Sequence, residues 1–190
     1  MLNKKKSVQH SIKSKYHSKG SRVGEKLKKK GVRKVRIYVK GVTNPCDSSV
    51  CGYGVVIAYD GEILRINGLI EEGTANRAEI QATITAFENL PPGESYKIEV
   101  FSNSTYLVNG CERGRKLILQ SVNWDHMPDN PMPNWDQWSH LIEQIGSRSV
   151  VFTWISSQHV DSYMKIATGL ARDALRGDYA QAKGAPPAMA

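Results

Sequence analysis

The chain of 190 residues has few cysteines and no long hydrophobic run. Its three cysteines, Cys46, Cys51 and Cys111, form neither a disulfide framework nor a CxxC zinc knuckle. No apolar run approaches the ~18 residues of a transmembrane helix, and the start of the chain lacks the apolar core of a secretory signal. We therefore expect a protein of the cytoplasm or another reducing intracellular compartment, without a membrane partner.

Acidic residues are nearly absent from the first 36 positions. This segment holds 14 of the 26 lysines and arginines and a single acid, Glu25, so its net charge is +13. The remaining residues hold 12 basic and 17 acidic side chains, which gives −5. A strongly cationic arm joined to a mildly acidic domain is typical of a protein that binds polyanions through the arm.

Residues 1–33 have no apolar periodicity, and we expect this segment to be disordered in isolation because it buries too little apolar surface to offset its backbone entropy. The functional interpretation is an arm that binds RNA or DNA, with Tyr16, His10 and His17 stacking on bases. A solubilising tail is the alternative, and a mitochondrial transit peptide fits less well because lysine dominates over arginine. The predicted phosphate contacts are Lys4, Lys5, Lys6, Lys13, Lys15, Lys19, Arg22, Lys28, Lys29, Lys30, Arg33 and Lys34.

Residues 34–177 are expected to form one α/β domain, followed by a flexible tail over 178–190. Alternating apolar residues predict three consecutive strands, with an Asp-Gly turn between the second and the third. After Thr74, a candidate N-cap, the apolar period changes to 3.6, and helices and strands alternate from there. The segment 111–134 is expected to be irregular. The predicted strands are 35–39, 52–59, 62–68, 96–101 and 150–155, and the predicted helices are 74–90, a short one within 102–110, 135–145 and 164–175.

Four groups of residues form motifs that follow one another along the chain. They are IYVKG at 37–41 with Asn44-Pro45 and GYG at 52–54; TANRAE at 74–79 with AFENL at 86–90; FSNSTYL at 101–107; and Asn134, Asp136, Trp138 and Leu141, followed by Trp154-Ile155 and Leu170-Ala171-Arg172. Together with the order of elements, these groups resemble the ribonuclease H family over roughly residues 35–176. The resemblance implies a mixed five-stranded sheet, three antiparallel strands followed by two helix-linked strands, flanked by helices.

The family cleaves the RNA of RNA–DNA hybrids with two divalent cations that four carboxylates hold. The resemblance places these four positions at Lys40, Glu79, Asn103 and Thr168, of which only Glu79 is a carboxylate. The charge of the four groups therefore changes from about −4 to near zero, whereas Mg²⁺ needs anionic oxygen ligands. The resemblance implies a pseudoenzyme with no catalytic residue, metal or other cofactor.

The family's mobile catalytic histidine falls on Gln158, with His159 one position further along. An alternative is thus a divergent nuclease that acts on RNA–DNA hybrids with Mg²⁺ or Mn²⁺, using Glu79, Asp47 or Asp161, and His159. A second alternative is a protein-interaction or inhibitor module without nucleic acid.

Lys40 is expected to place its ammonium where a cation would sit and to pair with Glu79. The alternative for Lys40 is a solvated side chain at the end of a strand. Asp173, five residues after Thr168, is expected to face elsewhere on its helix.

The surface beside the family's active site is shaped for an A-like duplex, and losing the metals need not change that shape. Because the folded part is net acidic, the arm is expected to supply most of the electrostatic affinity. We expect a non-catalytic nucleic-acid-binding protein, an RNA-anchored component of a ribonucleoprotein or ribosome-associated complex with protein partners. Its domain contacts to RNA or an RNA–DNA hybrid are predicted at Asn44, Asn76, Arg77, Arg113, Arg115 and Lys116, where turn, cap or solvated-loop roles are the alternatives.

Overall fold

A computed structural model describes residues 33–90, 96–119, 133–158 and 161–177, and within 113–119 it describes the backbone only. The basic arm up to residue 32 and the tail over 178–190 lie outside the described residues. The elements are β1 (Arg33–Thr43), β2 (Cys51–Tyr59), β3 (Glu62–Ile70), α1 (Ala75–Glu88), β4 (Tyr96–Ser102), α2 (Thr105–Leu119), α3 (Trp135–Ile145), β5 (Ser149–Trp154) and α4 (Ser162–Leu175).

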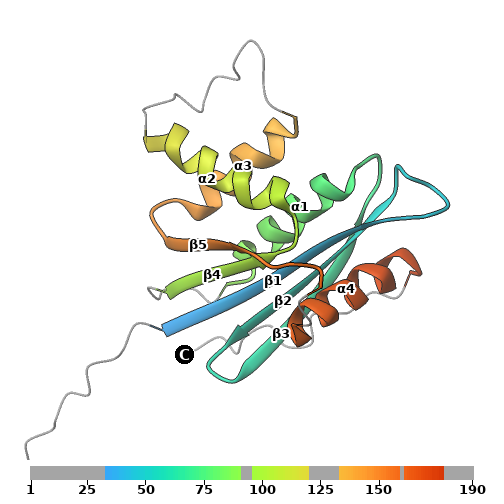
Figure 1. Cartoon of the computed structure of the whole chain (residues 1–190), viewed down its shortest axis with the longest axis horizontal. Coiled ribbons are helices and arrows are strands. Elements are labelled where there is room, and N and C mark those ends of the chain that lie inside the picture. The colour runs from blue at the N-terminus through green and yellow to red at the C-terminus, as the bar shows by residue number, and fades with distance from the viewer. Residues whose placement is uncertain (1–32, 91–95, 120–132, 159–160, 178–190) are drawn as a thin grey trace, which may run out of the picture. The chain divides into compact units, whose positions relative to one another are not determined.

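The strands form one sheet in the order β3-β2-β1-β4-β5 (Figure 1). The first three strands are antiparallel neighbours, whereas β4 runs parallel to β1 and β5 runs parallel to β4. Helical connections lead into β4 and β5, as parallel pairing requires. The predicted mixed five-stranded sheet is confirmed.

Helices cover the two faces of the sheet differently. Ile37 and Val39 of β1 belong to the larger core cluster, which also holds buried residues of α1, α2 and α3. Tyr38, the residue between them, belongs to a smaller cluster with Met164, Ala167 and other residues of α4. Since neighbouring side chains of a strand point to opposite faces, α1, α2 and α3 pack on one face and α4 on the other.

Two glycines of β2 let α4 approach the sheet closely. A Cβ atom at Gly52 would lie 2.1 Å from the carbonyl oxygen of Ala171, and one at Gly54 would lie 2.1 Å from that of Ala167. Both contacts involve helix backbone, which cannot rotate away as a side chain can. The glycines therefore set the depth at which α4 rests on the sheet.

The pairing of β1 with β4 ends before β1 itself does. Its last pair is Tyr38 with Phe101, and β1 continues to Thr43 paired with β2 alone. Lys40 and Asn103 each come two residues after that last pair. The carboxyl ends of adjacent parallel strands are where open α/β sheets commonly form their binding crevice. A ligand-binding site is therefore expected at this edge of the sheet.

Several boundaries differ from those predicted. α2 continues to Leu119, although we expected an irregular chain after Gly110. Gly110 is tolerated inside the helix because the ring of Trp138 lies against it, 2.4 Å from where a Cβ would stand. α4 begins at Ser162, two residues earlier than expected, because the Asp161 carboxylate accepts hydrogen bonds from the backbone N–H groups of Tyr163 and Met164.

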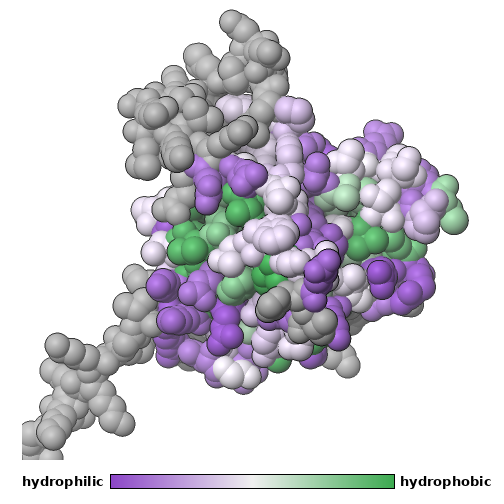
Figure 2. Space-filling view, in the orientation of Figure 1, coloured by the Kyte–Doolittle hydropathy of each residue, from purple (hydrophilic) through white to green (hydrophobic). Residues whose placement is uncertain are grey.

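Exposed hydrophobic residues are scattered over the surface. On the face shown in Figure 2 they form separate small areas between hydrophilic side chains. Among the described residues, the most exposed large hydrophobic side chains are Ile63, Val151 and Trp154. None of the helices in the described part of the chain has the length and hydropathy of a membrane-spanning segment.

Candidate functional site

Three side chains from three elements meet where β1 and β4 stop pairing. The Lys40 ammonium donates to Glu79 Oε1 at 2.9 Å and to Asn103 Oδ1 at 2.9 Å. Lys40 comes from β1, Glu79 from α1, and Asn103 from the turn that follows β4. The predicted pairing of Lys40 with Glu79 is confirmed.

The Glu79 carboxylate is almost fully buried, with 3 % of its side chain exposed. Besides Lys40, it accepts a hydrogen bond from Ser102 Oγ at 2.7 Å on Oε2 and one from the Gly41 backbone N–H at 3.4 Å on Oε1. A buried charge is tolerated only when paired and hydrogen-bonded, and Glu79 meets both conditions. Ser102 was not among the predicted site residues, although it belongs to the FSNSTYL group, because the sequence alone does not show that its hydroxyl reaches Glu79.

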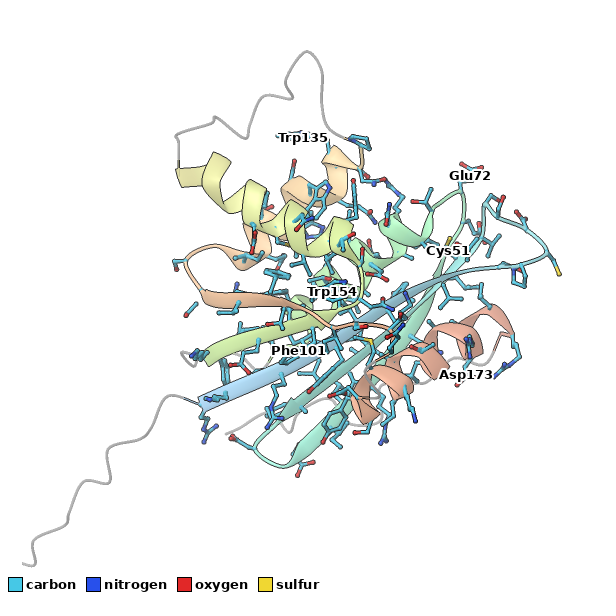
Figure 3. All side chains as sticks on the ribbon, viewed as in Figure 1. Cys51, Glu72, Phe101, Trp135, Trp154 and Asp173 are labelled. Atoms are coloured by element: carbon cyan, nitrogen blue, oxygen red, sulfur yellow. The ribbon has the colours of Figure 1, made fainter. Side chains whose placement is uncertain are left out.

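The four positions that the family resemblance selects do lie together. Lys40, Asn103 and Thr168 line one open cleft beside α4, with a volume of about 510 Å³, and Glu79 is bonded to Lys40. The Thr168 hydroxyl donates to the Met164 carbonyl at 2.8 Å, within its own helix. Trp154 lies at the end of β5 (Figure 3), where its indole N–H donates to the Asn103 carbonyl at 3.1 Å.

This group of residues does not fit a divalent cation. Mg²⁺ is held by carboxylates, carbonyls and waters in a shell of oxygen, whereas Glu79 Oε1 and Asn103 Oδ1 both accept hydrogen bonds from the Lys40 ammonium. Over the described residues, no group of three or more His, Cys, Asp or Glu side chains is arranged to hold a metal ion. The positive charge at the centre of the site is supplied by the protein itself.

The aspartates that an alternative metal site would use have other partners. Asp161 lines the cleft, but its carboxylate caps α4. Asp47 lies in an exposed loop, where hydrogen bonds from the Ser49 hydroxyl and backbone N–H lower the pKa of its carboxyl. Asp173 lies further along α4 (Figure 3) and pairs with Arg176.

The predicted catalytic-histidine position is only partly described. Gln158 is exposed in the loop between β5 and α4, and its backbone N–H donates to Ser156 Oγ at 3.3 Å. His159 lies outside the described residues.

Three of the predicted nucleic-acid contacts on the domain, Asn44, Asn76 and Arg77, have described side chains. The Asn44 side chain accepts from the Cys46 backbone N–H at 2.9 Å, which is the turn role considered for it. Asn76 is exposed at the start of α1. Arg77 makes two hydrogen bonds, of 3.0 and 2.5 Å, to the Asp136 carboxylate on α3.

This ion pair raises the pKa of Arg77 and lowers that of Asp136. It connects α1 to α3 across 59 positions of sequence. A nucleic-acid contact of Arg77 remains a prediction. Asp136 as its partner was not foreseen, because only the packing of the two helices reveals it.

The remaining predicted contacts lie at the start of β1, on α2 and in the arm. Arg33 and Lys34, which sequence analysis assigns to phosphate contacts, are the first residues of β1, and Arg33 pairs with Asp60 at 3.2 Å. The side chains of Arg113, Arg115 and Lys116, on the second half of α2, lie outside the described residues, as do the predicted arm contacts from Lys4 to Lys30.

Two cationic side chains at the cleft were missed. Lys165 and Arg172 line it from α4, on the same side as Thr168. Their spacing from Thr168, three residues before and four after, is that of one face of a helix. This spacing is a signal that the sequence contains and that points to them once Thr168 is placed at the site.

Comparison with known proteins gives a consistent result. The chain matches the model of the RNase H family over residues 32–175. It is 31% identical over 104 residues to a ribonuclease H of Desulforamulus reducens, covering 55% of this chain and 64% of that protein, slightly less than two thirds of its length. It is 30% identical over 149 residues to a ribonuclease H of Prosthecochloris aestuarii, covering 77% of this chain and 98% of that protein.

A solved structure shares the fold. The crystal structure of LC11-RNase H1 in complex with RNA/DNA hybrid aligns with a TM-score of 0.57 and 24% identity, covering 76% of this chain and 98% of that chain. At this level of identity the likeness concerns the fold alone.

Proposed function

The chain belongs to the RNase H family, and from this premise we propose that it binds RNA or an RNA–DNA hybrid without cleaving it. In this proposal it is an RNA-anchored component of a ribonucleoprotein or ribosome-associated complex. A shared fold alone is a weak guide to function, so the proposal depends on the site.

One observation carries the proposal: the Lys40 ammonium bridges Glu79 and Asn103 at 2.9 Å each. Cleavage by the family's chemistry needs cations to stabilise the attacking water and the leaving oxygen. A fixed ammonium between the remaining oxygen ligands opposes cation binding by charge repulsion and by occupying the space. Nucleic-acid binding does not require those cations, and a relative with this fold, LC11-RNase H1, binds RNA/DNA hybrid.

The charge distribution supports complementary roles for the two parts of the chain. Residues 1–36 have a net charge of +13, and the rest of the chain has −5. Binding to nucleic acid gains free energy from counterion release as basic residues neutralise phosphates. In the proposal the arm supplies this affinity, and the domain contributes shape and protein contacts.

A cleavage assay tests the absence of catalysis. The full-length protein is incubated with a labelled RNA–DNA hybrid in Mg²⁺ and separately in Mn²⁺, beside the Glu79→Gln variant. We expect no product above that of the variant. Product from the wild-type protein that disappears in Glu79→Gln would instead support a divergent nuclease, for which Asp161 at the cleft and His159 beside Gln158 are the candidate partners.

Crosslinking tests the cellular role. The protein is crosslinked in its native cell and the attached RNA is sequenced, for the wild-type chain and for a variant with Lys4, Lys5, Lys6, Lys28, Lys29 and Lys30 changed to Gln. One dominant structured RNA, lost in the variant, is the expected result. No RNA, together with a protein partner that stays bound after nuclease treatment, would favour the interaction-module alternative.

A further inference from the structure

We propose that the cleft beside α4 binds one backbone phosphate of the nucleic acid through Lys40, Lys165 and Arg172, without a divalent cation. This inference rests on the proposed function and adds a ligand group and two binding residues to it. The residues at the site do not fit the family's metal ions, because their own side chains supply the positive charge that the cations would bring.

The cleft is electropositive. Lys40, Lys165 and Arg172 line it with three positive charges, against one negative charge from Asp161. The Asp161 carboxylate is turned toward two backbone N–H groups at the start of α4, which leaves less of its charge directed into the cleft. Lys165 and Arg172 are exposed, and within the described residues neither of them has an ion pair.

Lys40 retains a hydrogen-bond donor for a ligand. An ammonium group has three N–H donors, and Glu79 and Asn103 accept two of them. The third is left for an acceptor on the cleft side, which Lys40 lines. Glu79 balances much of the charge of Lys40, so the surplus positive charge comes from Lys165 and Arg172.

Asn103 also offers a hydrogen-bond donor, since it lines the same cleft. Its side-chain oxygen accepts from Lys40, and therefore its amide NH₂ points away from Lys40. Ser156 and Ser157, which carry hydroxyl groups, belong to the same lining. Ammonium, guanidinium, amide and hydroxyl donors around one space form the combination that binds a phosphate through charge-assisted hydrogen bonds.

Hybrid binding measured by fluorescence anisotropy tests the proposal. The full-length protein is titrated with a short labelled RNA–DNA hybrid at several salt concentrations, in EDTA and in Mg²⁺. The variants are Lys165→Gln, Arg172→Gln and the double variant. Lys97→Gln is the control, since Lys97 is an exposed lysine at the opposite end of β4. Because Lys165 and Arg172 are exposed, thermal unfolding is expected to show intact folding in every variant.

The wild-type protein is expected to bind equally well in EDTA, and the double variant to bind about tenfold more weakly, as expected for lost hydrogen bonds to a charged group. The salt dependence gives a second measure. The slope of log K against log salt falls by about one in the double variant, since one phosphate contact is lost. Lys97→Gln is expected to bind as the wild type does.

Three results would overturn the proposal, and they separate it from the proposed function. If the double variant binds as Lys97→Gln does, the cleft is not a phosphate site, although hybrid binding stands. If Mg²⁺ strengthens binding and Glu79→Gln abolishes this effect, the site holds a cation after all. If the wild-type protein binds neither RNA nor hybrid, both the cleft and the proposed function are wrong.

Discussion

Arg77 and Glu79, only two positions apart on α1, each form an ion pair with another element, and the two pairs differ in almost every respect. Arg77 reaches across to Asp136 on α3, where the two side chains are 31% and 61% exposed. Glu79 reaches Lys40 on β1, where the carboxylate is 3% and the lysine 20% exposed. The first is a contact between two helices at the surface, and the second is the centre of a buried polar network.

The difference teaches that environment, more than geometry, decides what an ion pair contributes. The Arg77 pair has the better geometry, since it forms two parallel hydrogen bonds, yet exposed pairs stabilise little because water and salt screen them. The Lys40 pair forms a single hydrogen bond, but removal of either partner leaves a buried charge or donor without compensation.

Removal of Lys40 is expected to have the largest effect. Lys40→Ala leaves the buried Glu79 charge without its cation and lowers the free energy of unfolding by about 3 kcal/mol, the lower end of the range for breaking a buried pair. Urea unfolding monitored by circular dichroism measures this loss.

The matched control is the double variant Lys40→Met with Glu79→Gln, which removes both charges and keeps similar volumes. We expect it to recover most of the stability lost in Lys40→Ala. If the double variant is as unstable as Lys40→Ala, the buried charge is not the cause of the loss.

The next effect concerns the backbone that brings the buried pair together. A Cβ atom at Gly41 would lie 2.5 Å from the Ala75 carbonyl oxygen and 2.8 Å from Glu79 Cγ. Gly41→Ala therefore forces β1 and α1 apart, and we expect a loss of about 2 kcal/mol. Gly169→Ala is the control, because no atom other than those of its own stretch of helix backbone lies within 4 Å of its Cβ position in α4; it is expected to raise stability by about 0.5–1 kcal/mol. Equal effects of the two substitutions would contradict the close approach.

Breaking the exposed pair is expected to cost less. Arg77→Ala and Asp136→Ala should show a coupling free energy of less than about 1 kcal/mol in a double-mutant cycle, decreasing further at high salt. A coupling as large as that of Lys40 with Glu79 would reverse the comparison.

The smallest effect is a pH dependence of the same pair. The hydrogen bonds from Arg77 lower the pKa of Asp136, so this carboxylate stabilises the fold above its unfolded pKa of about 3.9. That contribution is lost as the pH falls through the lower, folded value. The stability difference between the wild type and Asp136→Asn should therefore be larger at neutral pH than under strongly acidic conditions. A difference that does not change over this range would show that Arg77 does not act on the carboxylate.

The buried pair could be predicted from the sequence, whereas the exposed one could not. Motif order placed Lys40, Glu79, Asn103 and Thr168 at one site, and charge complementarity then suggested the pairing. Asp136 also belongs to the family pattern, but the pattern does not say that it contacts Arg77. That contact depends on how α3 packs against α1.

Other features could not be predicted from the sequence, for similar reasons. Strand and helix positions followed from apolar periodicity, but α2 extends beyond Gly110 because Trp138 packs against that glycine, a tertiary effect that local propensity does not contain. Asp161 was considered as a possible metal ligand, whereas it caps α4. The two roles need the same residue type, and only the backbone geometry distinguishes them.

The close contact of β2 with α4 has a consequence for how the family site can diversify. Gly52 and Gly54 hold the backbone of the helix against the sheet at Ala171 and Ala167, whereas Lys165 and Arg172, which line the cleft, are exposed on the outer part of the same helix. Substitutions along the outward side of α4 can therefore change the charge of the cleft while the helix stays in place. Such an arrangement makes ligand preference an evolvable property of one helix face, separate from the stability of the fold.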